Sequence, residues 1–202
     1  MEKMTKSKMV LMTTSRIINI ISSDLKSPRS KALLSNLRNS VGRPISENIG
    51  SLQIVYENMP EELLGKNFSM TKEECAILTT LQLFAIHQQS NVEPVSERIE
   101  GKWNNVGYSL KALRSDGSLS TDQRFNALVT SQTFEELTHH LRQMIKLLKS
   151  KKKGVKVDYP ALSLDLYNFL RGYDESVRLN WARAYYSYSK EENEKGEIEN
   201  EQ

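Results

Sequence analysis

Apolar residues recur along most of this chain at the three- and four-residue spacing that is typical of amphipathic helices. The pattern is clearest in residues 137–157, where a helix turning by about 100° per residue places an apolar stripe opposite a row of cations. The stripe consists of Leu137, Leu141, Met144, Ile145 and Leu148. The row consists of Arg142, Lys146 and Lys149. We therefore expect one side of this helix to be buried in a core and the other side to form a cationic surface.

Further helices are indicated by capping residues that precede apolar periodic segments. They are expected at residues 9–23, 27–42, 46–60, 109–114 and 158–172, and from residues 71, 120, 133 and 174 onward. Ser27 followed by Pro28 is a favourable helix start, and capping boxes begin at Thr71, Ser120 and Thr133. No segment shows the alternation of apolar and polar residues that indicates strands. The sequence predicts an all-α protein.

The helix pattern weakens in the middle of the chain, where Pro94 and several asparagines favour a loop. We expect two packed helical lobes, formed by residues 1–90 and 107–189, with residues 91–106 as the connecting loop. Residues 190–202 contain six Glu and two Lys and are expected to form an acidic disordered tail.

The composition is ordinary for a soluble globular protein, with 38% hydrophobic and 26% charged residues in 202. The single cysteine, Cys75, excludes an intramolecular disulfide and a cysteine-based zinc site, and it fits a reducing cytoplasm. No apolar run approaches the roughly 20 residues that a membrane-spanning helix needs. No membrane association is expected.

Charge is segregated along the chain, although the formal net charge is only +3. Residues 137–157 hold seven basic residues and no acidic one, and a second acid-free stretch spans residues 25–46. The basic residues of that second stretch are Lys26, Arg29, Lys31, Arg38 and Arg43. Two such stretches, one in each expected lobe, can line a common groove for a polyanion such as nucleic acid. An ordinary solvated helix face is the competing interpretation.

The sequence offers little support for catalysis. His139 and His140 are adjacent and cannot share one helix face as metal ligands, and Cys75 and His87 lie about 18 Å apart along one expected helix. There is no glycine-rich phosphate loop. We expect no enzyme activity, no cofactor, no metal ion and no small-molecule substrate. Trp181, Tyr185 and Tyr188 have a helical spacing that favours a place in the core.

Four segments, in this order, resemble the motif series of the CasB family, the small subunit of the type I-E CRISPR surveillance complex Cascade. They are SPRSKALLSNLRNSVGRP, LQLFAIHQQ, QRFNALVTSQTFEELTHHLRQMIKLL and VDYPALSLDLYNFL…RLNWARAYY. The likeness extends over roughly residues 10–188. It implies an all-helical, non-catalytic protein in the cytoplasm of a prokaryote. Two copies are expected to pack head to tail along the subunits that carry the crRNA.

The resemblance also implies that a basic surface holds the target and displaced DNA strands near the crRNA–DNA hybrid and stabilises the R-loop. The residues matched to basic family positions are Arg29, Lys31, Arg38, Lys111, Arg114, Arg124 and Arg142. Charge patterning adds Arg43, Lys146 and Lys149 as nucleic-acid contacts. Trp181, Arg183 and Tyr185 match the C-terminal signature, with structural roles for the two aromatic residues. The alternative is a helical protein-interaction scaffold that makes no direct contact with nucleic acid.

Overall fold

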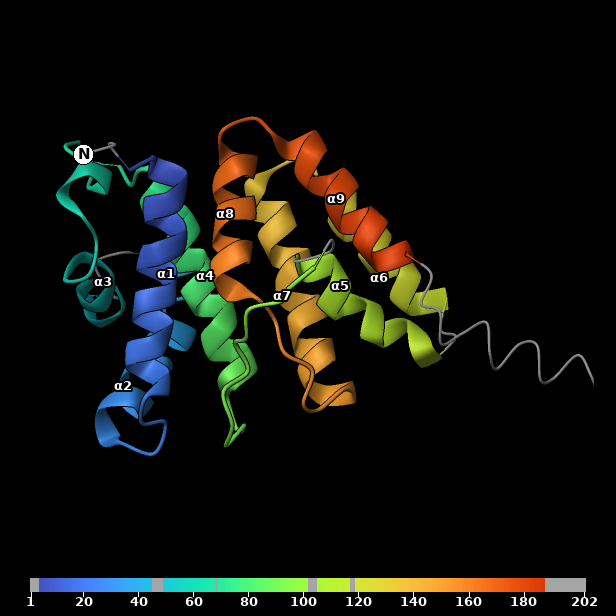
Figure 1. Cartoon of the computed structure of the whole chain (residues 1–202), viewed down its shortest axis with the longest axis horizontal. Coiled ribbons are helices and arrows are strands. Elements are labelled where there is room, and N and C mark those ends of the chain that lie inside the picture. Colours follow the sequence, from blue (N-terminus) through green and yellow to red (C-terminus); the bar gives the residue numbers. More distant parts are fainter. Residues whose placement is uncertain (1–3, 45–48, 68, 102–104, 117–118, 188–202) are drawn as a thin grey trace, which may run out of the picture.

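The computed structural model describes residues 4–44, 49–67, 69–101, 105–116 and 119–187, and over these residues the protein is all-α, as the sequence predicts (Figure 1). The first half contains α1 (Lys6–Ser22), α2 (Pro28–Asn39), α3 (Ile49–Tyr56), η2 (Glu61–Leu63) and α4 (Lys72–Gln88). The second half contains α5 (Val106–Lys111), η3 (Ala112–Asp116), α6 (Leu119–Val129), α7 (Phe134–Lys151), α8 (Tyr159–Leu170) and α9 (Asp174–Tyr186). The expected acidic tail, residues 190–202, lies outside the described residues.

Several helices begin where their capping residues predict. The Thr71 side chain accepts from the Glu74 backbone N–H, and the Glu74 carboxylate accepts from the Thr71 backbone N–H, which completes the capping box of α4. Ser27 and Asp158 cap α2 and α8 in the same way, each accepting from the backbone N–H three residues later. Thr133 caps α7 by accepting from the Glu136 N–H, but the Glu136 carboxylate accepts from the Gln132 N–H, so the predicted capping box is only half formed. Local sequence chemistry therefore sets these starts.

Two expected boundaries were wrong. Ser120 lies inside α6, which already begins at Leu119, so it is not the cap ahead of that helix. The short helix expected from residue 109 begins three residues earlier, at Val106. There Val106 and Gly107 are buried against α9, so tertiary packing extends the helix backwards from the position that local signals indicate.

The core is built from the apolar faces of the longer helices. All five residues of the predicted α7 stripe are fully buried, as are Trp181 and Tyr185 of α9, while Tyr188 lies outside the described residues. α8 packs against α1 and α4 and also contacts α9 (Figure 1). It therefore joins helices from both halves of the chain, and the division into two lobes stays a prediction.

α4 and α7 run parallel to each other. The Glu135 charge acts on Cys75 near the start of both helices, and Lys149 contacts Gln89 near the end of both. In the part of the chain that the structure describes, every helix is too short or too polar to cross a membrane.

Candidate nucleic-acid interface

Three cations on α2 and α7 are half-buried and lack a carboxylate partner among the described residues. They are Arg38, Arg142 and Lys149. Burial lowers the pKa of each of them below its ordinary value, because it removes water from around the charged form. The buried Nε atom of Arg142 also lacks a hydrogen-bond partner. Fully solvated surface cations would show neither feature.

The structure brings the two acid-free stretches together. The Arg38 charge lies close enough to Lys149 to lower the pKa of that ammonium group further, as the second cause after burial. Lys149 is held by Gln89, whose Oε1 accepts a hydrogen bond from Nζ at 3.0 Å. Gln89 and Arg38 line one pocket, so the end of α4 lies beside a cation of α2 and a cation of α7. The groove that both stretches were predicted to share stays a prediction.

Helix periodicity extends this cluster along both helices. Lys31 and Arg38 are seven residues apart, so they share one side of α2, and both line a pocket with Lys26. Lys146 is exposed and shares the cationic side of α7 with Arg142 and Lys149. We refer to these six side chains as the basic face. They are Lys26, Lys31, Arg38, Arg142, Lys146 and Lys149.

Five of the predicted contacts lie outside the basic face, and Arg114 is one of them. Arg29 is exposed on a different side of α2 from Lys31, and Arg43 is exposed beyond the end of that helix. Arg124 is exposed on α6, and Lys111 donates to the Ser187 hydroxyl at 3.4 Å. α5 and α6 lie at the opposite end of the long axis from α2 (Figure 1).

Arg114 is the predicted contact whose charge is most clearly satisfied. Its Nε donates to Asp122 Oδ1 at 3.4 Å, and its guanidinium lies 5.5 Å and 5.0 Å from the ring centroids of Tyr185 and Tyr186. Asp122 also accepts from the Tyr185 hydroxyl at 2.8 Å. This pairing is structural. Asp122 compensates the Arg114 charge, so Arg114 attracts an anionic ligand less strongly than Arg38 or Arg142 does. Its role in binding stays a prediction.

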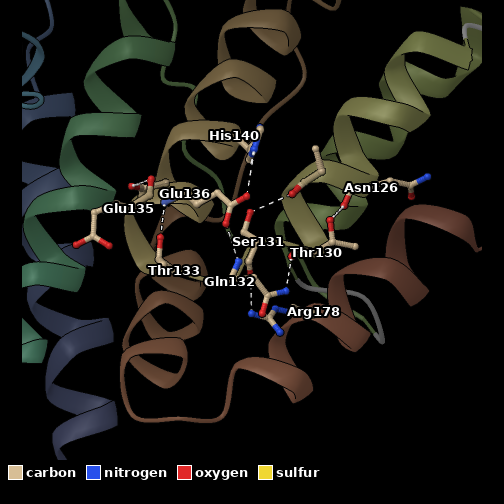
Figure 2. Close-up of polar contacts among 11 residues, drawn as sticks. Asn126, Thr130, Ser131, Gln132, Thr133, Glu135, Glu136, His140 and Arg178 are labelled. Carbon is tan, nitrogen blue, oxygen red and sulfur yellow. Dashed lines mark hydrogen bonds and ion pairs between the residues drawn. The ribbon is translucent and has the colours of Figure 1, made fainter.

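Arg178 is an arginine with a structural role, and its charge is paired within the chain. Its guanidinium pairs with Asp174 at 3.1 Å and Glu175 at 2.7 Å and donates to the Ser131 carbonyl, as Figure 2 shows in part. These contacts fix the turn between α6 and α7. Arg178 also leaves its buried Nε without a partner, but two carboxylates balance its charge. Arg38 and Arg142 have no such balance among the described residues.

His87 and Cys75 lie on α4, as the sequence predicts, and neither is activated for catalysis. Burial, and to a smaller extent the Lys149 charge, lowers the pKa of His87 to about 4, so the ring is neutral near pH 7. Its Nδ1 lies 3.0 Å from the Tyr159 hydroxyl. Burial and nearby carboxylates raise the pKa of the Cys75 thiol, which disfavours the reactive thiolate. The described residues contain no group of three or more His, Cys, Asp or Glu that could hold a metal ion.

Two residues of the interface were absent from the contacts predicted by sequence. Lys26 belongs to the acid-free stretch, but it precedes α2, so helix periodicity could not place it on the same side as Lys31 and Arg38. Gln89 carries no charge, so no charge pattern could single it out. Its contact with Lys149 joins residues 60 positions apart, and periodicity within one helix says nothing about such a pairing.

Over the described residues, the protein is all-helical and has a cationic surface on α2 and α7 whose half-buried members lack a carboxylate partner. The family model of CRISPR-associated protein Cse2 matches residues 33–186. The chain therefore belongs to the Cse2 family, and the predicted CasB relationship is confirmed. Among curated proteins, no relative matches.

Solved structures with the same fold include CasB from Thermobifida fusca, with a TM-score of 0.70, 24% identity, and coverage of 92% of this chain and 100% of that one. A Cse2-family CRISPR-associated protein from Thermus thermophilus has a TM-score of 0.61 and 20% identity, covering 87% of this chain and 98% of its own. A chain of a structure described as a CRISPR RNA-guided surveillance complex has a TM-score of 0.59 and 19% identity, covering 87% and 91% respectively. At these identities the likeness shows a common fold.

Proposed function

We propose that this protein is the non-catalytic small subunit of a type I-E Cascade complex and that its basic face binds nucleic-acid backbone. In this role it positions target DNA and stabilises the R-loop during crRNA-guided antiviral defence. The observation that carries the proposal is the set of half-buried cations on α2 and α7 that no carboxylate of the described chain balances.

The energetics of burial favour an external anion. Partial removal of a charge from water is unfavourable unless a partner of opposite charge compensates. Arg178 has that compensation within the chain, whereas Arg38 and Arg142 lack it in the described residues. Phosphate groups would supply it, and the planar guanidinium can donate two hydrogen bonds to one phosphate. An arrangement that leaves these two arginines without a carboxylate in the described part of the chain therefore suits a polyanionic ligand.

Contact with the backbone also fits a complex whose sequence recognition comes from a guide RNA. Lys and Arg bound to phosphates supply affinity without reading the bases. In RNA-guided recognition, R-loop formation is a nearly balanced exchange of one duplex for another, so contacts to strand backbones can shift it. Such contacts suit a guide-programmed complex, because its target sequence changes with each guide.

Family membership supports the proposed partners. The partners are the other Cascade subunits, above all those that carry the crRNA, together with a second copy of this chain. The likeness to a chain of a CRISPR RNA-guided surveillance complex is consistent with this assembly. The proposed location is the cytoplasm of a prokaryote, where guide RNA and invading DNA meet.

The test compares two double variants in the reconstituted complex. Arg38→Gln with Arg142→Gln removes two charges from the basic face, and Arg16→Gln with Arg183→Gln removes two charges elsewhere, on α1 and α9. We expect the first variant to retain target DNA at least about hundredfold more weakly, since each of the two lost charged hydrogen bonds contributes about 1.5–3 kcal/mol. The control is expected to stay close to the unmodified complex.

Circular dichroism verifies that both variants keep their helical content, and retention is measured by fluorescence anisotropy on a preformed R-loop. Equal retention by the two variants would show that the basic face does not hold DNA. In that case, normal assembly of both variants would favour a scaffold that contacts only proteins.

A further inference from the structure

A pocket of about 390 Å³ lies at the α2 end of the basic face, between the turn that precedes α2 and the residues that follow α4. Pockets that hold small ligands have volumes of about 300–1,000 Å³, so this one has room for a single small group rather than for a helix or a duplex. Its position at the end of the basic face places it beside the proposed backbone contacts.

One wall of the pocket is cationic. Lys26, Lys31 and Arg38 line it, and no carboxylate is among its lining residues. Two acidic residues, Asp24 and Glu93, adjoin the lining in sequence without lining the pocket. The Oδ1 atom of Asp24 accepts the backbone N–H groups of Lys26 and Ser27 at 3.1 Å each. The wall therefore favours an anionic group.

The remaining residues that line the pocket are uncharged, and some are apolar while others are polar. Leu25 and Leu34 contribute apolar surface, and Val92, which is 78% exposed, adds an apolar side chain at the mouth. Gln89 also lines the pocket, and its Oε1 is occupied by Lys149, so its amide nitrogen keeps two donors for a ligand. Apolar surface beside a cationic wall suits a ligand that is both flat and apolar in one part and anionic in another.

The segment after α4 is held in place before any ligand binds. The Gln88 amide nitrogen donates to the carbonyls of Asn91 and Glu93 at 3.0 and 2.9 Å, and its oxygen accepts from the Val95 N–H at 3.1 Å. Ser90 has a φ of +67°, a left-handed conformation that non-glycine residues rarely adopt. A wall ordered in this way spares a ligand the entropic cost of ordering it.

We propose that this pocket takes one unpaired nucleotide of a single strand, with the base against Leu25, Leu34 and Val92 and the adjoining phosphate on Lys31 and Arg38. The inference rests on the proposed function and deepens it, since it names unpaired, single-stranded nucleic acid as the ligand. A base inside a duplex must be unpaired and unstacked before it can enter a pocket, which costs free energy, whereas a strand separated from its complement presents its bases freely. An acidic peptide would satisfy the cations but would leave the apolar lining without a ligand group.

The experiment uses the full chain and two strands of equal length and charge, oligothymidylate and an abasic deoxyribose-phosphate strand. Anisotropy at low salt should show about fivefold tighter binding of oligothymidylate, below the effect of stacking on an aromatic ring because the lining is aliphatic. Val92→Ser should abolish that preference without changing binding of the abasic strand. Leu179→Ser, at a half-exposed position on α9, is the matched control and should retain the preference.

Photocrosslinking with a 4-thiothymidine strand should label peptides within residues 25–34 or 88–92. Salt-dependent binding of both strands with equal affinity would overturn the nucleotide pocket and leave the proposed backbone contact standing. Absence of salt-dependent binding to either strand would overturn both. Displacement of oligothymidylate by a poly-glutamate peptide as effectively as by unlabelled strand would also overturn the pocket, because the base would then contribute nothing.

Discussion

At the scale of single residues, the arginines of this protein differ in whether a carboxylate lies within reach, and this difference distinguishes structural arginines from candidate binding residues. Arg178 and Arg114 have carboxylates within reach, and both fix contacts between helices. Arg38 and Arg142 are half-buried without one among the described residues. The sequence places Arg178 four residues after Asp174, a spacing that predicts their pairing. It offers no comparable signal for the absence of partners, because that depends on residues distant in sequence.

Asp165 on α8 is a second group whose surroundings determine its chemistry. Burial, aided by the charge of Asp158, raises the pKa of this carboxyl to about 7, although the hydrogen bond from the Trp181 indole N–H, at 2.7 Å, opposes the change. In the unfolded chain the carboxyl has an ordinary pKa near 4. Between pH 4 and 7 the folded state therefore binds more protons, and stability falls as the pH rises through this range.

Asp165→Asn should remove this pH dependence, because the amide oxygen can still accept the Trp181 N–H while carrying no charge. We expect the variant to be more stable than the unmodified protein by an amount on the order of 4 kcal/mol at pH 8, and by only about 1.4 kcal/mol near pH 5. Urea denaturation at both pH values measures the difference. The exposed Glu62→Gln serves as the control and should change stability equally little at both.

His87 changes the pH dependence of stability in the opposite direction to Asp165. Its folded-state pKa of about 4 lies below the ordinary value, so the stability that it contributes is present above pH 6.5 and is lost as the pH falls toward 4. Both the variant and the unmodified protein carry His87, so the difference between them at each pH isolates the Asp165 effect. A variant Asp165→Asn that gains no stability between pH 5 and pH 8 would contradict the assignment.

At the scale of elements, local chemistry determined most helix starts, and packing determined the rest. The caps Ser27, Thr71, Thr133 and Asp158 act as their sequence predicts, because each cap is a contact within three residues. The start of α5 was missed because it depends on α9. The sequence suggested a shared groove but did not predict that Arg38 lies near Lys149. Periodicity shows which residues share a face of one helix, but it does not show which helix faces pack together.

The contact between α5 and α9 requires a residue without a side chain. A Cβ at Gly107 would lie 2.2 Å from the Trp181 carbonyl oxygen and 2.9 Å from its carbon, and these backbone atoms cannot move without displacing α9. Gly107→Ala should therefore destabilise the protein by about 1–3 kcal/mol, in spite of the better helix propensity of alanine. Thermal denaturation measures the loss.

Gly65→Ala is a suitable comparison, because the atoms nearest to its added Cβ would lie at 3.3 Å. Its loss of stability should be clearly smaller than that of Gly107→Ala. Equal stability of the two variants would mean that α5 and α9 are not packed as closely as the structure shows.

At the scale of the whole molecule, cations lie at both ends of the long axis. The basic face gathers α2, the end of α4 and α7, while Lys111, Arg114 and Arg124 lie toward the α5 and α6 end (Figure 1). The sequence predicted the helical class and the cationic row of α7 from periodicity alone. It could not rank the cations, because burial and pairing depend on tertiary contacts. The ranking proposed here gives most weight to Arg38, Arg142 and Lys149.

The most direct test of this account is the salt dependence of target-DNA binding by the assembled complex. Each phosphate contact contributes about 0.9 to the slope of log affinity against log salt concentration on duplex DNA and about 0.7 on single strands. A complex that carries Arg38→Gln and Arg142→Gln should therefore show a slope shallower by about 1.4–1.8 than the unmodified complex. The Arg16→Gln and Arg183→Gln control should keep the original slope. Identical slopes for all three complexes would contradict the claim that the basic face binds the nucleic-acid backbone.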